Sequence, residues 1–478
     1  MKFTDIPSLG LSRAVSPSGG LTLRRCPTPP GQPTNGGRLT CRKRTSHTHS
    51  MRPVRVPCHR PGWAAPSICP PNSMRTPSPP RGWTNRHEAL RSQLTLSPRS
   101  TPGGRLQRMT LPAGALSIHP SAARDFTDGR KLARYLEELF DSETGPLGWP
   151  GYLCATISRP EAITACLAAD HTLTDGYSVL LTAYEIHTLY AAALAAANGK
   201  PAPPPHPPTA SYLDFAEAER TAADALTAAH ESIVHWRQFL TEAGGRLPEF
   251  PVPGSDVSGS PAAQPGGYTE LVDASTAHAF DRVCRAAGGA SFSGLLACLA
   301  KVGHEITGSG EFRTMAPFHT RTGPSRSSIG WYVGMGPIAF PLSATDSFAE
   351  AVRSAVSGLD GVKDLVQIPT PRVEELLGRP LRDPFMFRTV TFVAPPVPAT
   401  GTLGGLSSSA AAAPTRTTCT SGSCVTTTAS SSTTVTLRPA RQASRSPHHM
   451  ASIKHLLASI ASTARWPATA HPTGDYCP

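Results

Sequence analysis

The chain contains 478 residues, 39% of them hydrophobic and 6% aromatic, and carries a formal net charge of +12. This length is sufficient for two or three domains. The charge is unevenly distributed, because 31 of the 33 acidic residues lie between Glu88 and Asp383 with only 24 of the 45 lysines and arginines. The basic ends lack the lysine clusters and interleaved aromatic residues that follow a phosphate backbone, so we expect no nucleic-acid partner.

The eleven cysteines show neither paired Cys nor Cys/His spacing, so we expect no metal site. Four of them lie in apolar surroundings and are expected to be buried thiols: Cys154, Cys166, Cys284 and Cys298. The odd number of cysteines and the lack of an apolar secretory segment favour a reducing compartment. No apolar run reaches the length of a membrane span. We therefore expect a cytoplasmic monomer without a membrane span.

Residues 1–83 and 394–478 are expected to be irregular. The first segment is rich in proline and arginine, and the second is rich in serine, threonine and alanine. Three explanations stay open. In the first, both ends are disordered tails. In the second, residues 1–83 are a targeting peptide, which leaves residues 394–478 unexplained. In the third, both ends are out-of-frame translation of GC-rich DNA, which contains few codons for acidic residues in the wrong frame.

Hydrophobic spacing between these ends predicts a first half over residues 84–199. Its expected elements are a helix over 126–143 capped by Asp128, strands over 152–158 and 161–170, and a helix over 177–197. The proline-rich segment 200–210 then indicates a linker between two lobes.

The second half, residues 211–393, also mixes helices and strands. The predicted helices cover 211–240, 276–288, 291–308, 346–359 and 371–378, and the predicted strands cover 312–319, 331–342 and 386–393. Two comparable mixed halves indicate an α/β or α+β fold with a cleft between the lobes.

The stretch "AADHTLTDGYSVL" (168–180) carries the candidate chemistry. A histidine at a strand–loop–helix junction, here His171, has a pKa suited to removing a proton from an attacking hydroxyl or amine. Asp175 is placed to cap the next helix or pair with an arginine, and Gly176 leaves room for a substrate near the backbone. An ordinary polar turn with Asp-Gly fits the same letters, so the motif alone leaves both interpretations open.

Five blocks in order make the pattern more specific. "DHTLTDG" (170–176) resembles the H-H-x-x-x-D-G motif of the condensation-domain superfamily, which includes condensation domains of nonribosomal peptide synthetases, polyketide-associated acyltransferases and chloramphenicol acetyltransferase. The other similar blocks are "NRHEALRS" (85–92), "YLDFA" (212–216), "IGWYVGMGPIAF" (329–340) and "RDPFMFRTVTFV" (382–393).

The resemblance implies two chloramphenicol-acetyltransferase-like lobes that form a pseudo-dimer around a central tunnel. It implies that His171 is the catalytic base and that Asp175 is structural, paired with Arg86 or Arg91. Asp170 replaces the first histidine of the motif and is expected to support the base. The candidates for lining the tunnel are His319, Arg321, Trp331 and Tyr332.

The implied activity is acyl transfer from a thioester, carried on coenzyme A or on the phosphopantetheine of a carrier protein, to a hydroxyl or amine of a small-molecule acceptor. The implied setting is lipid, polyketide or peptide secondary metabolism, without a bound cofactor. The block "GWYVG" (330–334) resembles the polyketide-associated acyltransferases, which act on hydroxyls of sugars or lipids. The alternative is a non-catalytic condensation-like scaffold or a decayed enzyme.

Overall fold

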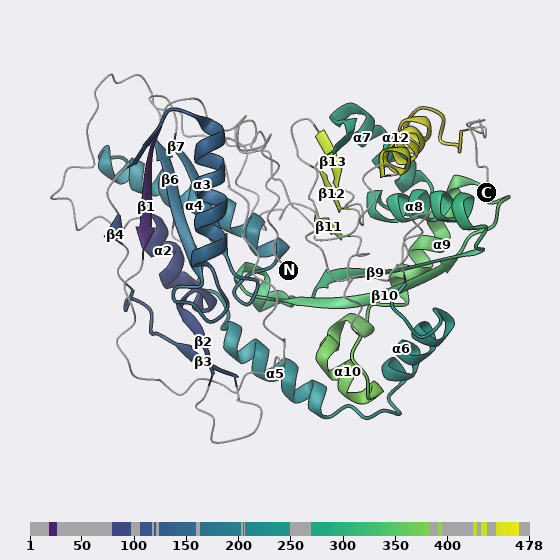
Figure 1. The fold of residues 1–478 in the computed structure, drawn as a ribbon, viewed down its shortest axis with the longest axis horizontal. Helices are drawn as coiled ribbons and strands as arrows, with labels where there is room; N and C mark the ends of the chain where they lie inside the picture. The colour runs from purple at the N-terminus through teal and green to yellow at the C-terminus, as the bar shows by residue number, and fades with distance from the viewer. Residues whose placement is uncertain are drawn as a thin grey trace.

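The structure of the chain is a computed structural model. The residues that it describes are 19–25, 79–96, 106–116, 119–120, 124–158, 163–201, 204, 206–248, 269–381, 391–393, 424–427, 432–436 and 446–467. In Figure 1 they form two lobes that lie side by side, with helix α5 (Tyr212–Asp224) running between them.

The first lobe is built on an antiparallel sheet with the order β4-β1-β6-β7, in which β5 also pairs with β1. Its strands are β1 (Gly19–Arg25), β4 (His119–Pro120), β5 (Arg124–Phe126), β6 (Tyr152–Ser158) and β7 (Ile163–Ala169). A two-stranded ribbon of β2 (Ser92–Leu96) and β3 (Leu106–Thr110) lies beside it. The helical elements of this lobe are α2 (Pro79–Arg86), η1 (Glu88–Arg91), α3 (Gly129–Glu143) and α4 (Gly176–Ala197).

Strand β6 shows why this lobe has a helix on each face of its sheet. Successive side chains of a strand point to opposite faces. Leu153 and Ile157 pack with buried residues of α3, whereas Tyr152 and Cys154 pack with buried residues of α4. The predicted cap of α3 is confirmed, because the Asp128 carboxylate accepts from the N–H groups of the first helical turn.

The second lobe combines helices with a long hairpin and a separate sheet of order β11-β12-β13-β8. Its strands are β8 (Thr269–Asp273), β9 (Glu311–His319), β10 (Val333–Pro341), β11 (Thr391–Val393), β12 (Cys424–Thr427) and β13 (Ser432–Thr436). Its helical elements are α6 (Glu231–Glu242), α7 (Ala274–Ala286), α8 (Ser291–Thr307), η2 (Gly323–Ser327), α9 (Phe348–Asp360), η3 (Leu365–Gln367), α10 (Thr370–Leu377) and α12 (Ser446–Thr463).

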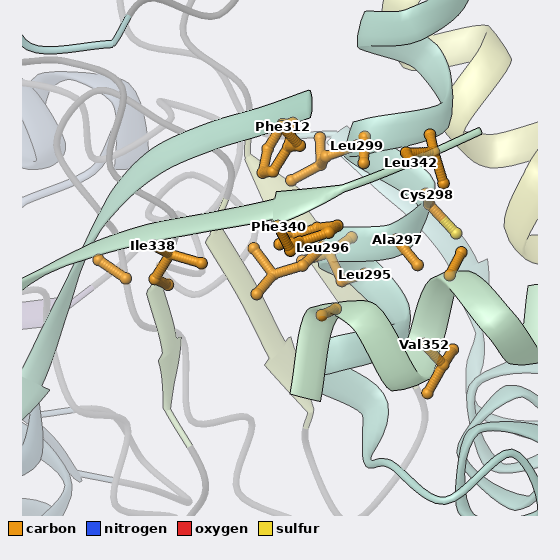
Figure 2. Close-up of a cluster of buried hydrophobic side chains, with 14 of the residues drawn as sticks. Leu295, Leu296, Ala297, Cys298, Leu299, Phe312, Ile338, Phe340, Leu342 and Val352 are labelled. Carbon is orange, nitrogen blue, oxygen red and sulfur yellow. The ribbon is translucent and has the colours of Figure 1, made fainter. Parts of the chain in front are cut away.

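Helix α8 lies at the centre of this lobe, as its apolar sequence predicts. Figure 2 shows Leu296 and Leu299 of α8 beside Phe312 of β9 and Phe340 of β10. The two phenylalanines are register partners, with ring centroids 5.3 Å apart. All four cysteines expected to be buried are buried free thiols. In the described part of the chain no single helix could span a membrane, and only α7 and α8 together, bent by 91°, reach the required length and composition.

The β9–β10 hairpin connects the second-lobe core with the junction of the lobes (Figure 1). A close contact sets its position: a Cβ added to Gly334 would lie 1.6 Å from the carbonyl oxygen of Val366. Only glycine allows the backbone of η3 to approach the strand this closely. Residues 320–332 connect the two strands of this hairpin and contact the first lobe through Arg321, Ile329 and Tyr332.

The structure differs from the prediction of irregular ends. Strand β1 and the start of α2 lie within residues 1–83, and β12, β13 and α12 lie within residues 394–478. The biased composition of these segments hides short apolar patterns, which decide local structure more directly. The predicted helix 211–240 is also two helices, because residues 225–230 form turns and the His230 side chain caps α6. The described residues of 200–210 contain neither helix nor strand.

Helix α12 offers a direct test of whether the C-terminal segment belongs to the folded lobe. Ile453 is fully buried in the second-lobe core, whereas Lys454 is exposed. We expect Ile453→Ala to lower the free energy of unfolding by about 2–5 kcal/mol, because it leaves a cavity. Lys454→Ala, the control, should change it by less than about 0.5 kcal/mol. Equal midpoints of urea unfolding for the two variants would contradict this packing.

Candidate active site

The candidate active-site loop, residues 170–175, connects β7 to α4. It begins with a tight turn closed by a hydrogen bond from the Leu173 N–H to the Asp170 carbonyl at 3.0 Å, and the Asp170 N–H donates to the Gly151 carbonyl, just before β6, at 2.8 Å. The Asp170 carboxylate also accepts from the Thr172 N–H at 2.8 Å. Hydrogen bonds at its first residue therefore fix the conformation of the loop and its position beside the start of β6.

His171 is half-buried, and its contacts define which nitrogen can act as a base. The Nδ1 atom lies 2.8 Å from the Thr174 carbonyl oxygen. A carbonyl oxygen only accepts, so Nδ1 carries the hydrogen and Nε2 carries the lone pair of the neutral ring. The Trp331 ring lies edge-on to the imidazole at a centroid distance of 4.7 Å. The ring of His171 is thus held in one tautomer and against one aromatic neighbour.

Asp175 forms a buried ion pair with Arg321 from the second lobe. The two guanidinium–carboxylate distances are 2.7 and 3.0 Å. The N–H groups of Ser178 and Tyr332 donate to the same carboxylate at 2.7 and 2.9 Å. The carboxylate therefore caps α4, which begins at Gly176, and ties this helix to the segment between β9 and β10.

Arg321 is enclosed by aromatic rings as well as by the carboxylate. Its guanidinium carbon lies 4.6 Å from the ring centroid of Tyr177 and 4.3 Å from that of Tyr332. Burial opposes ionisation of Asp175, but the charge of Arg321 and the hydrogen bonds outweigh it, so the pKa of Asp175 is lowered. A charged, fully paired carboxylate at this junction holds the two lobes together.

The prediction that Arg86 or Arg91 pairs with Asp175 is wrong. Arg86 pairs instead with Glu185 of α4, at an Nε–Oε1 distance of 3.0 Å. Arg91 donates to three main-chain carbonyls, those of Thr84, Asn85 and Leu111. Both arginines lie in the first lobe, where nearer acceptors are available, and the carboxylate of Asp175 faces the second lobe.

The block 85–92 connects α4, residue 329 and α5 through hydrogen bonds of His87 and Glu88. The His87 ring, fully buried, contacts the Glu185 carboxylate through Nε2 and accepts from the Ile329 N–H through Nδ1 at 3.3 Å. Burial lowers the pKa of His87, although Glu185 opposes this shift, so the ring is neutral and donates from Nε2. Glu88 accepts from the Ser211 hydroxyl and the Leu213 N–H, at the start of α5. The block therefore connects the first lobe to α5 and to residue 329.

The four tunnel candidates separate into two groups. Arg321 and Tyr332 are buried within the ion-pair cluster, so their predicted role as substrate-facing residues is corrected to one of support. Trp331 is half-buried beside the base, and His319 is exposed with its ring 5.6 Å from that of Tyr177. These two remain candidates for substrate contact. The pseudo-dimer and the tunnel stay predictions.

Sequence reasoning missed three residues that support the site. Ser178 accepts from the Gly330 N–H at 3.2 Å and contacts Arg321, Glu185 holds the 85–92 block, and Arg108 of β3 reaches the active-site loop. Ser178 and Glu185 lie three and ten residues after Asp175, a spacing that places them on α4 but does not identify their partners. No local pattern around Arg108 indicates its contact.

The buried ion pair makes a pH-dependent prediction. Asp175→Asn should lower the free energy of unfolding at pH 7 by about 3–5 kcal/mol, since it leaves Arg321 buried without a counter-charge. The pKa of Asp175 is lowered by folding, so the stabilisation is complete above the unfolded pKa of about 3.9 and is lost as pH falls through the folded pKa.

The difference in the free energy of unfolding between the wild type and Asp175→Asn should therefore be constant from pH 5 to 7 and shrink below about pH 4. Chemical denaturation across this range measures it. Asp360→Asn, which alters an exposed pair with Lys363, is the control and should change stability by less than about 1 kcal/mol. An unchanged difference down to pH 2.5 would contradict the assignment.

The close packing around Gly330 gives a second prediction, on the effect of adding a side chain there. A Cβ at this position would lie 2.4 Å from the Tyr212 ring and 2.8 Å from the Tyr332 ring, whereas a Cβ at Gly323 would meet no atom within 4 Å. Gly330→Ala should lower the free energy of unfolding by about 1–3 kcal/mol, because the rings must shift. Gly323→Ala is the matched control. Thermal unfolding midpoints that fall equally in both variants would refute this steric account.

Comparison with known proteins confirms the resemblance. A family model described as "Condensation domain" matches residues 81–381. The acyltransferase PapA3 of Mycobacterium tuberculosis is 31% identical over 242 residues, which cover 50% of each chain. PapA1 of Mycobacterium bovis, a 2'-acyl-2-O-sulfo-trehalose (hydroxy)phthioceranyltransferase, is 29% identical over 269 residues, which cover 56% of this chain and 51% of PapA1. The chain spans about half the length of the curated relatives it matches.

Solved structures share the fold. One described as "PapA2 acyl transferase" superposes with a TM-score of 0.66 and 22% identity, over 94% of this chain and 87% of that one. The first condensation domain of the calcium-dependent antibiotic synthetase gives a TM-score of 0.59 and 16% identity, over 94% and 91% of the two chains. The predicted class of mixed helices and strands is thereby confirmed. Because the family model covers more than half of its length, this chain belongs to the condensation domain family.

Proposed function

We propose that this protein transfers an acyl group from a thioester to a hydroxyl of a small-molecule acceptor. The observation that carries the proposal is the hydrogen bond from His171 Nδ1 to the Thr174 carbonyl. It assigns the lone pair to Nε2, which is the state a general base needs. The relatives named as acyltransferases, together with membership of the family, support the same reaction.

The proposed reaction uses His171 twice. Nε2 accepts the proton of the acceptor O–H as the oxygen attacks the thioester carbonyl carbon. The new C–O bond forms, the C–S bond breaks, and the leaving thiolate takes the proton back from Nε2. The base ends the cycle neutral, and the products are an ester and a free thiol. Trp331 limits rotation of the imidazole, and the Asp175–Arg321 pair fixes the loop that carries it.

The proposed substrates follow from the relatives. PapA2 of Mycobacterium bovis is named a trehalose-2-sulfate acyltransferase and is 30% identical over 211 residues. This name and that of PapA1 describe acyl transfer to a sugar, so a sugar or lipid hydroxyl is the proposed acceptor, in preference to an amine. The proposed donor is a thioester of coenzyme A or of a carrier protein's phosphopantetheine. The donor is a substrate, so the proposal needs no bound cofactor.

The test is acyl transfer by the His171→Ala variant. We expect the rate of ester formation to fall about 10²–10⁴-fold, because proton removal from the acceptor is lost. His235→Ala, which changes an exposed histidine on α6, is the matched control and should keep the wild-type rate. Mass spectrometry of the acylated acceptor, with an acyl-coenzyme A donor and a trehalose acceptor, measures the product.

Two outcomes would contradict the proposal. Equal product formation by wild type and His171→Ala would remove the histidine from the reaction. Absence of transfer by the wild type, with both donor forms and both hydroxyl and amine acceptors, would favour the non-catalytic scaffold.

A further inference from the structure

Arg108 is a buried arginine that no sequence block contains. It lies on β3, and its side chain is only 6% exposed. Its guanidinium donates to the Ser92 hydroxyl at 2.7 Å through Nη1 and to the Thr172 carbonyl at 3.2 Å through Nη2. Thr172 directly follows His171, so this contact links β3 to the main chain beside the candidate base.

The main chain of Thr172 is held on both sides. Its N–H donates to the Asp170 carboxylate at 2.8 Å, and its carbonyl accepts from Arg108. The residue after His171 therefore has neither main-chain group free to rotate. Together with the hydrogen bond from His171 Nδ1 to the Thr174 carbonyl, this arrangement fixes both the backbone and the ring of the histidine.

Arg108 also joins three blocks of the sequence. Ser92 closes the 85–92 block, where its hydroxyl donates to the Ala89 carbonyl at 2.8 Å. The Arg108 guanidinium lies 5.3 Å from the ring centroid of Tyr212, which begins α5. The third contact is the active-site loop itself. The Arg108 guanidinium thus contacts the active-site loop, the 85–92 block and the first residue of α5.

Asp170 gives Arg108 a nearby counter-charge. Its carboxylate is fully buried, and Oδ2 has no hydrogen-bond partner among the described residues. Burial raises the pKa of Asp170, while the hydrogen bonds from Thr172 and the charge of Arg108 act in the opposite direction. Removal of Arg108 would therefore leave a buried acid without its cation and the Thr172 carbonyl without its donor.

We infer that Arg108 is a positioning residue for the acyl-transfer reaction: it acts through the Thr172 main chain to hold His171 Nε2 in the position required for proton removal. The inference rests on the proposed function. A displacement of the base by about 1 Å can cost about 10²-fold in rate. Arg108 does not contact the acceptor in this account, so its loss should affect kcat rather than KM.

The kinetic test compares Arg108→Met, Arg108→Lys and Ser92→Ala with the wild type. Arg108→Met should lower kcat about 10–100-fold and change KM for donor and acceptor less than about 2-fold. Arg108→Lys should recover part of kcat, because the ammonium keeps the charge but reaches only one of the two acceptors. Ser92→Ala should have an intermediate effect. Arg124→Met, which removes an exposed arginine stacked on Tyr135, is the matched control and should keep the wild-type kcat.

A double-mutant cycle separates positioning from general support. In the His171→Ala background, Arg108→Met should have no further effect on the residual rate, because Arg108 acts only through this histidine. A role in overall stability would lower the rate equally in both backgrounds. Equal losses, or a wild-type kcat in Arg108→Met, would overturn the inference.

A second measurement does not depend on activity. Diethyl pyrocarbonate modifies neutral imidazoles, and peptide mass spectrometry gives the modification rate of His171 relative to His235. Arg108→Met should change this ratio at least about 3-fold by releasing the loop, and Arg108→Lys should change it less. An unchanged ratio would contradict the inference even if the chain transfers no acyl group. A changed ratio without activity would retain Arg108 as the support of His171 and place the failure in the proposed function.

Discussion

The buried pair of Asp175 and Arg321 is the interaction on which the arrangement of the site depends. Removing two charges from water is costly, and such a pair is maintained only where hydrogen bonds satisfy both groups. Here the carboxylate accepts from two main-chain N–H groups, and the guanidinium lies between two tyrosine rings. The partners are 146 residues apart, so their contact forms only when both lobes are folded. The position of the base is thereby coupled to the assembly of the whole domain.

The local structure around the site could be predicted from the sequence, because periodicity and capping act over a few residues. The strands 152–158 and 163–169, the helix that follows them and the Asp128 cap are examples. The arginine that pairs with Asp175 could not be predicted from the sequence. Several arginines lie in the similar blocks or near them, and only the three-dimensional arrangement identifies Arg321. The ends show another limit. Composition suggested irregular chain, yet Ile453 and Ile460 lie seven residues apart on α12 and both face the core.

Support for the candidate base comes from several distant parts of the chain. The 85–92 block, α5 and the loop before β10 contribute the side chains of Ser92, Tyr212 and Arg321, and none of these segments contains the histidine itself. Of the five blocks, 85–92, 170–176, 212–216 and 329–340 take part in these contacts, whereas residues 382–390 of the fifth lie outside the described residues.

His87 has a consequence for the acid tolerance of the protein. Its Nδ1 accepts from the Ile329 N–H, so protonation of that nitrogen replaces an attraction by a clash of two hydrogens. The pKa of this ring is lowered by burial, so the unfolded chain takes up a proton before the folded one does. Below a pH of about 6.5, proton uptake by the unfolded chain therefore draws the equilibrium away from the folded state. A single imidazole, remote from the reaction, thus makes mildly acidic conditions unfavourable to the native fold.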